Sequence, residues 1–275
     1  MTRTSPGFQD NIETPIHLLR RFGVDVHDSA DQTVTMSMSL AAMRNPVTGQ
    51  PTVAPLAVLA DAAAGALNHF RHGPGEWTVT TELTVELSPD GAERATAGDA
   101  PPVTATARLL GPRGNTSLSF YTLTCGDVVI GGGTVRSFFF APDQVILDEP
   151  PETLTRTADT GLAELMAIDV VTSTDDRCVL RQRPDPLLNN AIGVVNGGVA
   201  AAGLELAASA VINAGGPPFR TASLRVNFLR QFVAGQHSRY EANAVRIGRS
   251  TAVADAQAVA EDGRPALLAR VTAYR

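Results

Sequence analysis

The sequence predicts an α+β protein built from two copies of one module. Each copy would have a short first helix, one or two strands, one apolar helix and then several antiparallel strands. Two observations predict this organisation. Segments of the first half match segments of the second half in the same order. In both halves, a helix-like apolar stretch is followed by runs in which polar and apolar residues alternate, as in half-buried strands.

The internal repeat is visible in three pairs of segments. LLRRFGVDV aligns with LAELMAIDV at an offset of 144 residues, from position 18 to position 162. The same offset places Asp61 on Glu205. TTELTVELSP aligns with TASLRVNFLR at an offset of 141, from position 80 to position 221. We expect further strands over residues 103–110, 116–125 and 128–138 in the first half and 240–247, 251–260 and 266–274 in the second.

The segment between the halves is rich in Pro, Asp and Thr, which is typical of a linker. We therefore expect an N-terminal module over residues 1–140, a linker over 141–160 and a C-terminal module over 161–275.

Composition favours a globular protein outside the membrane. Hydrophobic residues make up 44% of the chain and charged residues 18%, which is too apolar for a disordered chain. No apolar run approaches the roughly 18 residues that a membrane-spanning helix needs. The first fifteen residues, MTRTSPGFQDNIETP, lack the apolar core of a secretory signal. We expect a cytoplasmic protein with no membrane partner.

Several function classes are excluded or disfavoured. The net charge of -6 and the absence of an Arg-rich block argue against nucleic acid as a partner. All 22 basic residues are arginine, so neither a Schiff-base lysine nor a P-loop can exist. Cys125 and Cys178 lie far apart without Cys-x-x-Cys spacing, which disfavours a redox motif or a zinc site. We expect no cofactor and no metal.

Each apolar helix carries one acid. Asp61 lies in the helix expected over residues 55–70, and Glu205 in the helix expected over 197–213. Small apolar residues surround both, so neither helix has a polar face and both should be enclosed. A carboxylate there is costly unless it is paired, lies in a cleft or has a function. An acid exposed at the helix rim is the simpler alternative, but the same register in both copies favours a function.

Two glycines open the second helix. The amides of Gly197 and Gly198 are among the unpaired N–H groups of a helix N-terminus, which bind anions or a developing oxyanion. Without side chains they would also let a substrate carbonyl come close. The alternative is that they only form a tight turn into the helix. Their spacing supports both interpretations equally.

The stretch NAIGVVNGG at residues 190–198, with Glu205 seven positions after Gly198, resembles a known signature. It is similar to the N-x-x-G-x-x-H-G-G-x(6)-[DE] motif of hotdog-fold acyl-CoA thioesterases, most closely the PaaI-like or 4-hydroxybenzoyl-CoA thioesterase-like branch. The strands starting at Thr80 and Thr221 resemble the strand that follows the helix in that family. Because both halves fit, the chain resembles a tandem double hotdog, which implies two apolar helices, each wrapped by a curved antiparallel sheet, in modules that lie side by side.

The resemblance implies sites shared between the modules. One site would join Asn190 and Gly197 with Asp61 and Thr80. The other would join the loop of the first half with Glu205 and Thr221. Asp61 would attack the thioester or activate water, Gly197 N–H would stabilise the oxyanion, Asn190 would orient the carbonyl or the water, and Thr80 would hold the water or the carboxylate.

The chain also departs from the family pattern. Asn196 stands where the family has histidine. In the first half the His-Gly-Gly positions hold Thr52, Val53 and Ala54, and Asn45 misses the register of the family asparagine by one. We therefore expect one competent site, the one that contains Asp61, and a second site around Glu205 that is degenerate or altered.

Further residues are candidates for substrate contact. Asn196, Gly198 and Thr221 would line the sites by resemblance. Arginines suit the phosphates of coenzyme A, and we select Arg246 and Arg249 among the candidates Arg225, Arg230, Arg246 and Arg249. His69 and His72 end the first apolar helix, where a cation favours the helix dipole, and we interpret them as structural.

The resulting expectation is a thioester hydrolase that cleaves an acyl-CoA to free acid and CoA at a composite site between the modules. A non-catalytic acyl-CoA or lipid-binding protein is the alternative, favoured by the altered loops. A hydratase or dehydratase is disfavoured because neither loop places a histidine near an aspartate. By resemblance we also expect a homodimer of double-hotdog chains.

Overall fold

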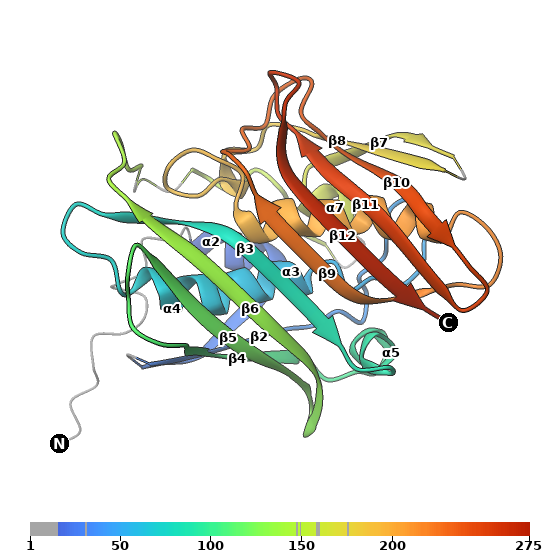
Figure 1. Ribbon diagram of the computed structural model, residues 1–275, viewed down its shortest axis with the longest axis horizontal. Coiled ribbons are helices and arrows are strands. Elements are labelled where there is room, and N and C mark those ends of the chain that lie inside the picture. Colours follow the sequence, from blue (N-terminus) through green and yellow to red (C-terminus); the bar gives the residue numbers. More distant parts are fainter. Residues whose placement is uncertain (1–15, 31, 147, 149, 158–159, 175) are drawn as a thin grey trace.

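The computed structural model describes residues 16–275 except 31, 147, 149, 158–159 and 175. Figure 1 shows the two halves of the chain side by side. The first half contains α2 (Ile16–Phe22), β1 (Val24–Ala30), β2 (Thr33–Met38), α3 (Leu56–Ala60), η1 (Asp61–Gly65), α4 (Ala66–His69), β3 (Trp77–Leu87), α5 (Gly91–Thr96), β4 (Val103–Leu109), β5 (Thr116–Cys125) and β6 (Val128–Phe140). The second half contains α6 (Leu162–Leu165), β7 (Ile168–Ser173), β8 (Arg177–Gln182), η2 (Pro186–Leu188), α7 (Gly197–Ile212), β9 (Arg220–Phe228), β10 (Arg239–Ile247), β11 (Thr251–Val259) and β12 (Pro265–Tyr274).

In the described part of the chain, the strands form one antiparallel 12-stranded sheet in the order β1-β2-β4-β5-β6-β3-β9-β12-β11-β10-β8-β7. The order is symmetric about its centre, so each strand of the first half has a counterpart at the same distance from the β3–β9 pair. That pair places Leu83 opposite Val226 and Val85 opposite Leu224. The two halves therefore share backbone hydrogen bonds as well as side-chain contacts.

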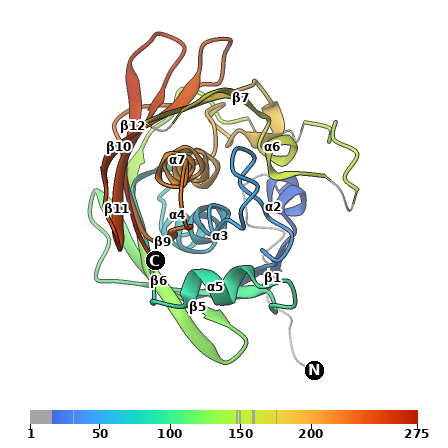
Figure 2. The same ribbon diagram turned by 90° about the vertical axis from the view of Figure 1, so that its right-hand side faces the viewer.

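The apolar helices lie inside the curve of this sheet, as Figure 2 shows for α3, α4 and α7. α3, η1 and α4 follow one another without a break, and α3 packs against α7. A side chain at Gly198 would not fit, because its Cβ would lie 2.7 Å from Val58 Cα and 2.8 Å from Ala57 O. Glycine at this position lets the two helix backbones approach each other closely.

The first apolar helix contains a wider turn that begins at Asp61. Asp61–Gly65 forms a π-helical segment between the two α-helical segments. Such turns are rare and occur frequently at functional sites. The expected extent of the helix, residues 55–70, agrees with the observed run from Leu56 to His69, but the sequence did not predict the π-turn.

The predicted fold class, an α+β double hotdog with a curved antiparallel sheet around apolar helices, is confirmed. The predicted strands correspond to β3–β6 and β9–β12. The short helices α5 and η2 were not predicted. The module boundaries at residues 140 and 161 remain a prediction. Among the residues described, no helix is long and apolar enough to cross a membrane.

Candidate active site

A cavity of about 400 Å³ lies where the two halves meet. The first half contributes walls from α2, the α3–α4 helix, β3 and β6, and the second half contributes the loop before α7 and the segment after β9. Five of the predicted site residues line this cavity: Asp61, Thr80, Asn190, Asn196 and Gly197. The structure thus brings the acid of the first half together with the loop of the second half.

Asp61 is held by one donor from each half. Thr80 Oγ1 donates a hydrogen bond of 2.7 Å to Asp61 Oδ1, and Gly198 N–H donates one of 2.9 Å to Asp61 Oδ2. Asp61 is only 8% exposed. Burial raises the pKa of Asp61 above its ordinary value, although the hydrogen bonds from Thr80 and Gly198 oppose the shift. The site therefore contains a desolvated, oriented carboxylate, as a general base or a nucleophile requires.

The two glycines have different environments. Gly198 N–H is bound to Asp61 and also to Asn196 Oδ1, at 3.0 Å. Gly197 N–H makes no hydrogen bond to any residue that the structure describes, and Gly197 lines the cavity. A Cβ at Gly197 would lie 3.1 Å from Asp61 Oδ2. Gly198 consequently fixes the carboxylate, and Gly197, whose amide bonds no described residue, lies next to the acid at the cavity.

The two asparagines shape the loop. Asn196 is the N-cap of α7, with Oδ1 accepting from Gly198 N–H and, at 3.2 Å, from Val199 N–H. Asn190 Oδ1 accepts from the amides of Ile192 and Val194 at 3.1 and 3.3 Å. Asn190 Nδ2 makes no hydrogen bond within the described chain, so this donor can serve a ligand in the cavity.

A second, smaller cavity of about 160 Å³ surrounds Glu205. Thr221 Oγ1 donates to Glu205 Oε1 at 2.6 Å, while the hydroxyls of Thr52 and Ser209 donate to Oε2 at 3.2 and 3.3 Å. Glu205 is 2% exposed. Burial raises its pKa, against the hydrogen bonds from Thr221, Thr52 and Ser209. Three hydroxyls thus satisfy this carboxyl without a substrate.

The loop of the first half explains the mismatch in register at Asn45. Asn45 N–H bonds Gln50 O, whereas Asn190 N–H bonds Val194 O, so the first loop has one additional residue within an otherwise similar turn. Asn45 Nδ2 donates to Leu206 O at 2.9 Å and to Ser209 Oγ at 3.0 Å. The amide that is available at Asn190 is therefore consumed at Asn45 by the neighbouring helix.

The four candidate arginines lie in different environments. Arg246 and Arg249 are exposed at the end of β10 and in the turn after it, and they line neither cavity. Arg225 pairs with Glu86 across the β3–β9 junction at 2.9 Å. Arg230 lines the first cavity. Arg230 was among the four candidates, but it follows the end of β9 at Phe228, so strand alternation could not distinguish it from the others.

Most residues of the cavity wall were not predicted from the sequence. Its apolar part comes from separate elements, including Leu18, Leu19, Trp77, Phe138, Phe140, Phe228 and Phe232. His69, interpreted as structural, also lines the cavity. Its Nδ1 pairs with Thr78 Oγ1 at 2.8 Å, and its ring stacks on His72 with centroids 4.4 Å apart. Only the folded chain brings these residues together.

The fold is that of a double hotdog, and a carboxylate, Asp61, lies where its two halves meet. The family model for the thioesterase superfamily matches residues 192–267, which include Gly197, Glu205 and Thr221. This match and the fold confirm the resemblance to hotdog-fold thioesterases.

Solved structures resemble the whole chain. The tesB protein of Mycobacterium avium subsp. paratuberculosis aligns with a TM-score of 0.63 and 13% identity over 94% of this chain and 98% of that one. The 12:0-ACP thioesterase of Umbellularia californica gives 0.56 and 12%, over 88% and 93%. A hot dog fold protein of unknown function from Alicyclobacillus acidocaldarius gives 0.55 and 13%, over 91% and 95%. Such identities support the fold alone. No curated protein matches the chain significantly.

Proposed function

We propose that this protein is an acyl-CoA thioesterase with one working site between its two modules. The observation that carries the proposal is the arrangement of Asp61 and Gly197. A buried carboxylate of the first half lies next to Gly197, whose amide at the N-terminus of α7 bonds no described residue, in a cavity with largely apolar walls. An acid beside an oxyanion donor is the pair that acyl transfer requires.

The chemistry follows from these groups. Sulfur conjugates poorly with the carbonyl, so a thioester carbon is open to attack. Asp61 either takes a proton from water, whose oxygen adds to that carbon, or adds itself and forms a mixed anhydride that water then hydrolyses. Gly197 N–H, with the helix dipole behind it, stabilises the oxyanion. The carbon–sulfur bond then breaks, and the CoA thiolate leaves and takes a proton while the free acid forms.

The remaining residues of the cavity have supporting roles in this proposal. Asn190 Nδ2 binds the carbonyl or the water, and Thr80 keeps Asp61 oriented. Arg230, at the cavity, replaces Arg246 and Arg249 as the candidate for the CoA phosphates. The Glu205 site is closed by its three hydroxyls and does not turn over substrate. The tandem-module boundaries, the homodimer and the cytoplasmic location stay predictions.

Thiol release from short, long and aromatic acyl-CoAs tests the proposal with wild type, Asp61→Asn and Glu205→Gln. We expect Asp61→Asn to lower kcat by about 10² to 10⁴, the usual contribution of a positioned acid or base. Glu205→Gln should keep most of the activity, because an amide oxygen can still accept from the surrounding hydroxyls.

Other outcomes would change the conclusion. Loss of activity in Glu205→Gln with survival in Asp61→Asn would assign the chemistry to the other site. Acyl-CoA binding without thiol release from any substrate would favour the non-catalytic binding protein.

A further inference from the structure

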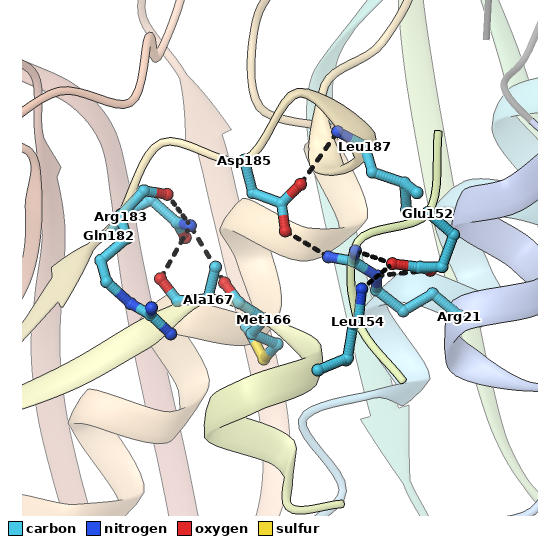
Figure 3. Close-up of polar contacts among 9 residues, drawn as sticks. All are labelled: Arg21, Glu152, Leu154, Met166, Ala167, Gln182, Arg183, Asp185 and Leu187. Carbon is cyan, nitrogen blue, oxygen red and sulfur yellow. Dashed lines mark hydrogen bonds and ion pairs between the residues drawn. The ribbon is translucent and has the colours of Figure 1, made fainter. Parts of the chain in front are cut away.

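An ion cluster around a buried arginine lies beside the candidate active site and joins three segments that are distant in the sequence. It consists of Arg21 on α2, Glu152 in the segment between the halves, and Asp185 before η2, and Figure 3 shows the guanidinium between the two carboxylates. Arg21 Nε donates to Glu152 Oε2 at 3.1 Å, its Nη2 contacts Glu152 Oε1, and its Nη1 contacts Asp185 Oδ2. Arg21 is 3% exposed.

Asp185 connects this cluster to the active-site loop. Its Oδ1 accepts from Leu187 N–H at 3.0 Å, so Asp185 caps the short helix η2. The last carbonyl of that helix, Leu188 O, accepts from Asn196 N–H at 2.8 Å. Asp185 thus fixes the base of the loop that carries Asn190 and leads into Gly197.

α2 connects the same cluster to the cavity wall. Leu18 and Leu19, within one turn of Arg21, line the cavity. Arg156 Nη1 donates to Arg20 O at 3.3 Å and to Arg21 O at 3.2 Å, so the segment between the halves also holds the end of α2. The Arg21 guanidinium therefore links α2 to the loop, and Arg156 holds the end of α2 as well.

The Arg21 guanidinium is buried, so the loss of one of its two carboxylates leaves its charge less compensated, which is costly. The planar guanidinium bonds two carboxylates at once, which the single ammonium of lysine does not reproduce. A change in the geometry of the cluster would therefore also move Asp185, which is hydrogen-bonded to the segment before the loop.

We propose that Arg21 is a positioning residue of this site: through Asp185 it fixes the loop that carries Asn190 and Gly197, and through α2 it fixes the wall formed by Leu18 and Leu19. The expected loss of kcat rests on the proposed function, whereas the expected change in hydrogen exchange of the loop does not.

Asp185→Asn is the informative variant. It keeps the Oδ1 acceptor for Leu187 N–H and removes the charge that binds Arg21. Asp169→Asn is the matched control, because Asp169 pairs with Arg181 on the exposed side of the same half, at 2.6 Å. We expect Asp185→Asn to lower kcat by about tenfold or more with little change in KM, since small misplacements of reacting groups are costly. Asp169→Asn should match wild type.

Hydrogen exchange of the peptide covering residues 186–200 supplies a readout that does not depend on activity. In Asp185→Asn this peptide should exchange faster than in wild type, while in Asp169→Asn it should not. Arg21→Lys should reproduce both effects of Asp185→Asn, and should also accelerate exchange of α2.

If Asp185→Asn leaves the loop's exchange and kcat unchanged, or lowers kcat no more than Asp169→Asn, the positioning role is wrong. An inactive wild type with faster loop exchange in Asp185→Asn would refute the proposed function and retain the coupling.

Discussion

Asp61 and Glu205 occupy the same register of two related helices but differ in what surrounds them. Asp61 receives one hydroxyl and one amide, and it borders the larger cavity. Glu205 receives three hydroxyls in a cavity less than half that size. Ser209, at the place that Gly65 has in the first half, supplies one of these hydroxyls. A single side chain at this position thus adds a hydrogen-bond donor to one acid that the other acid lacks.

Thr80→Val should shift the pH dependence of the reaction. The Thr80 hydroxyl stabilises the ionised form of Asp61 and so lowers its pKa, against the larger effect of burial, which raises it. Without the hydroxyl the pKa rises further, and the acid limb of kcat/KM moves to higher pH. Thr84→Val, on the same strand but bonded to Thr134, is the control. A profile of Thr80→Val that coincides with that of wild type would argue against Asp61 as the titrating group.

Glu205→Gln should stabilise the protein more at neutral than at acid pH. Burial raises the pKa of Glu205 in the folded state above 4.5, its ordinary value. Below that value both states hold the proton. As pH rises towards the folded pKa, the unfolded state loses its proton first, so wild type loses about 1.4 kcal/mol of stability for each pH unit that separates the two pKa values. Urea unfolding across this pH range measures the difference between the two proteins, and a constant difference would contradict the prediction.

At the scale of elements, the N-terminus of α7 combines two functions in adjacent residues. Gly198 allows α7 to pack on α3 and donates to Asp61, whereas Gly197 faces the cavity. The sequence identified both glycines but left open whether they form a turn or bind an oxyanion. The answer depends on how closely the first apolar helix approaches, and that helix lies more than 130 residues away in the sequence, as the Gly198–Asp61 bond shows.

Gly197→Ala and Gly198→Ala should therefore have different effects. The methyl of Gly198→Ala would lie 2.7 Å from Val58 Cα and 2.8 Å from Ala57 O, and backbone atoms cannot move aside easily. We expect a loss of about 1–3 kcal/mol of stability, as for an overpacked core. The methyl of Gly197→Ala would lie 3.1 Å from Asp61 Oδ2, and we expect mainly a lower kcat. Thermal melts and kinetics of the two variants provide the comparison, and equal losses of stability would contradict it.

At the scale of the whole molecule, the elements that could be predicted from the sequence are those that occur in both halves. Strand alternation and helix composition are local, so β3–β6, β9–β12 and the two apolar helices followed from the sequence. Pairing Asp61 with the loop before α7 followed from the resemblance. The cluster of Arg21, Glu152 and Asp185 could not be predicted, because its members are separated by 131 and 164 positions. The aromatic wall escaped prediction for the same reason.

The symmetric sheet also predicts how the chain unfolds. The halves share the β3–β9 hydrogen bonds, the α3–α7 packing and the Arg21 cluster, so neither half should keep its structure when the other unfolds. Trp77 is the single tryptophan and lies in the first half, where it is 6% exposed. Urea curves from Trp77 fluorescence and from far-UV circular dichroism should therefore coincide.

A variant of the second half sharpens this test. Leu180 on β8 is buried, and its strand pairs with β7 and β10 of the same half, so Leu180→Ala changes the second half away from the β3–β9 junction and should cost about 2–5 kcal/mol. If unfolding is cooperative, this change moves the midpoint reported by Trp77, which lies in the other half, as far as the midpoint reported by circular dichroism. If the Trp77 midpoint stays in place while the circular dichroism curve splits into two transitions, the modules unfold independently. The junction that forms the cavity would then add little to the stability of either module.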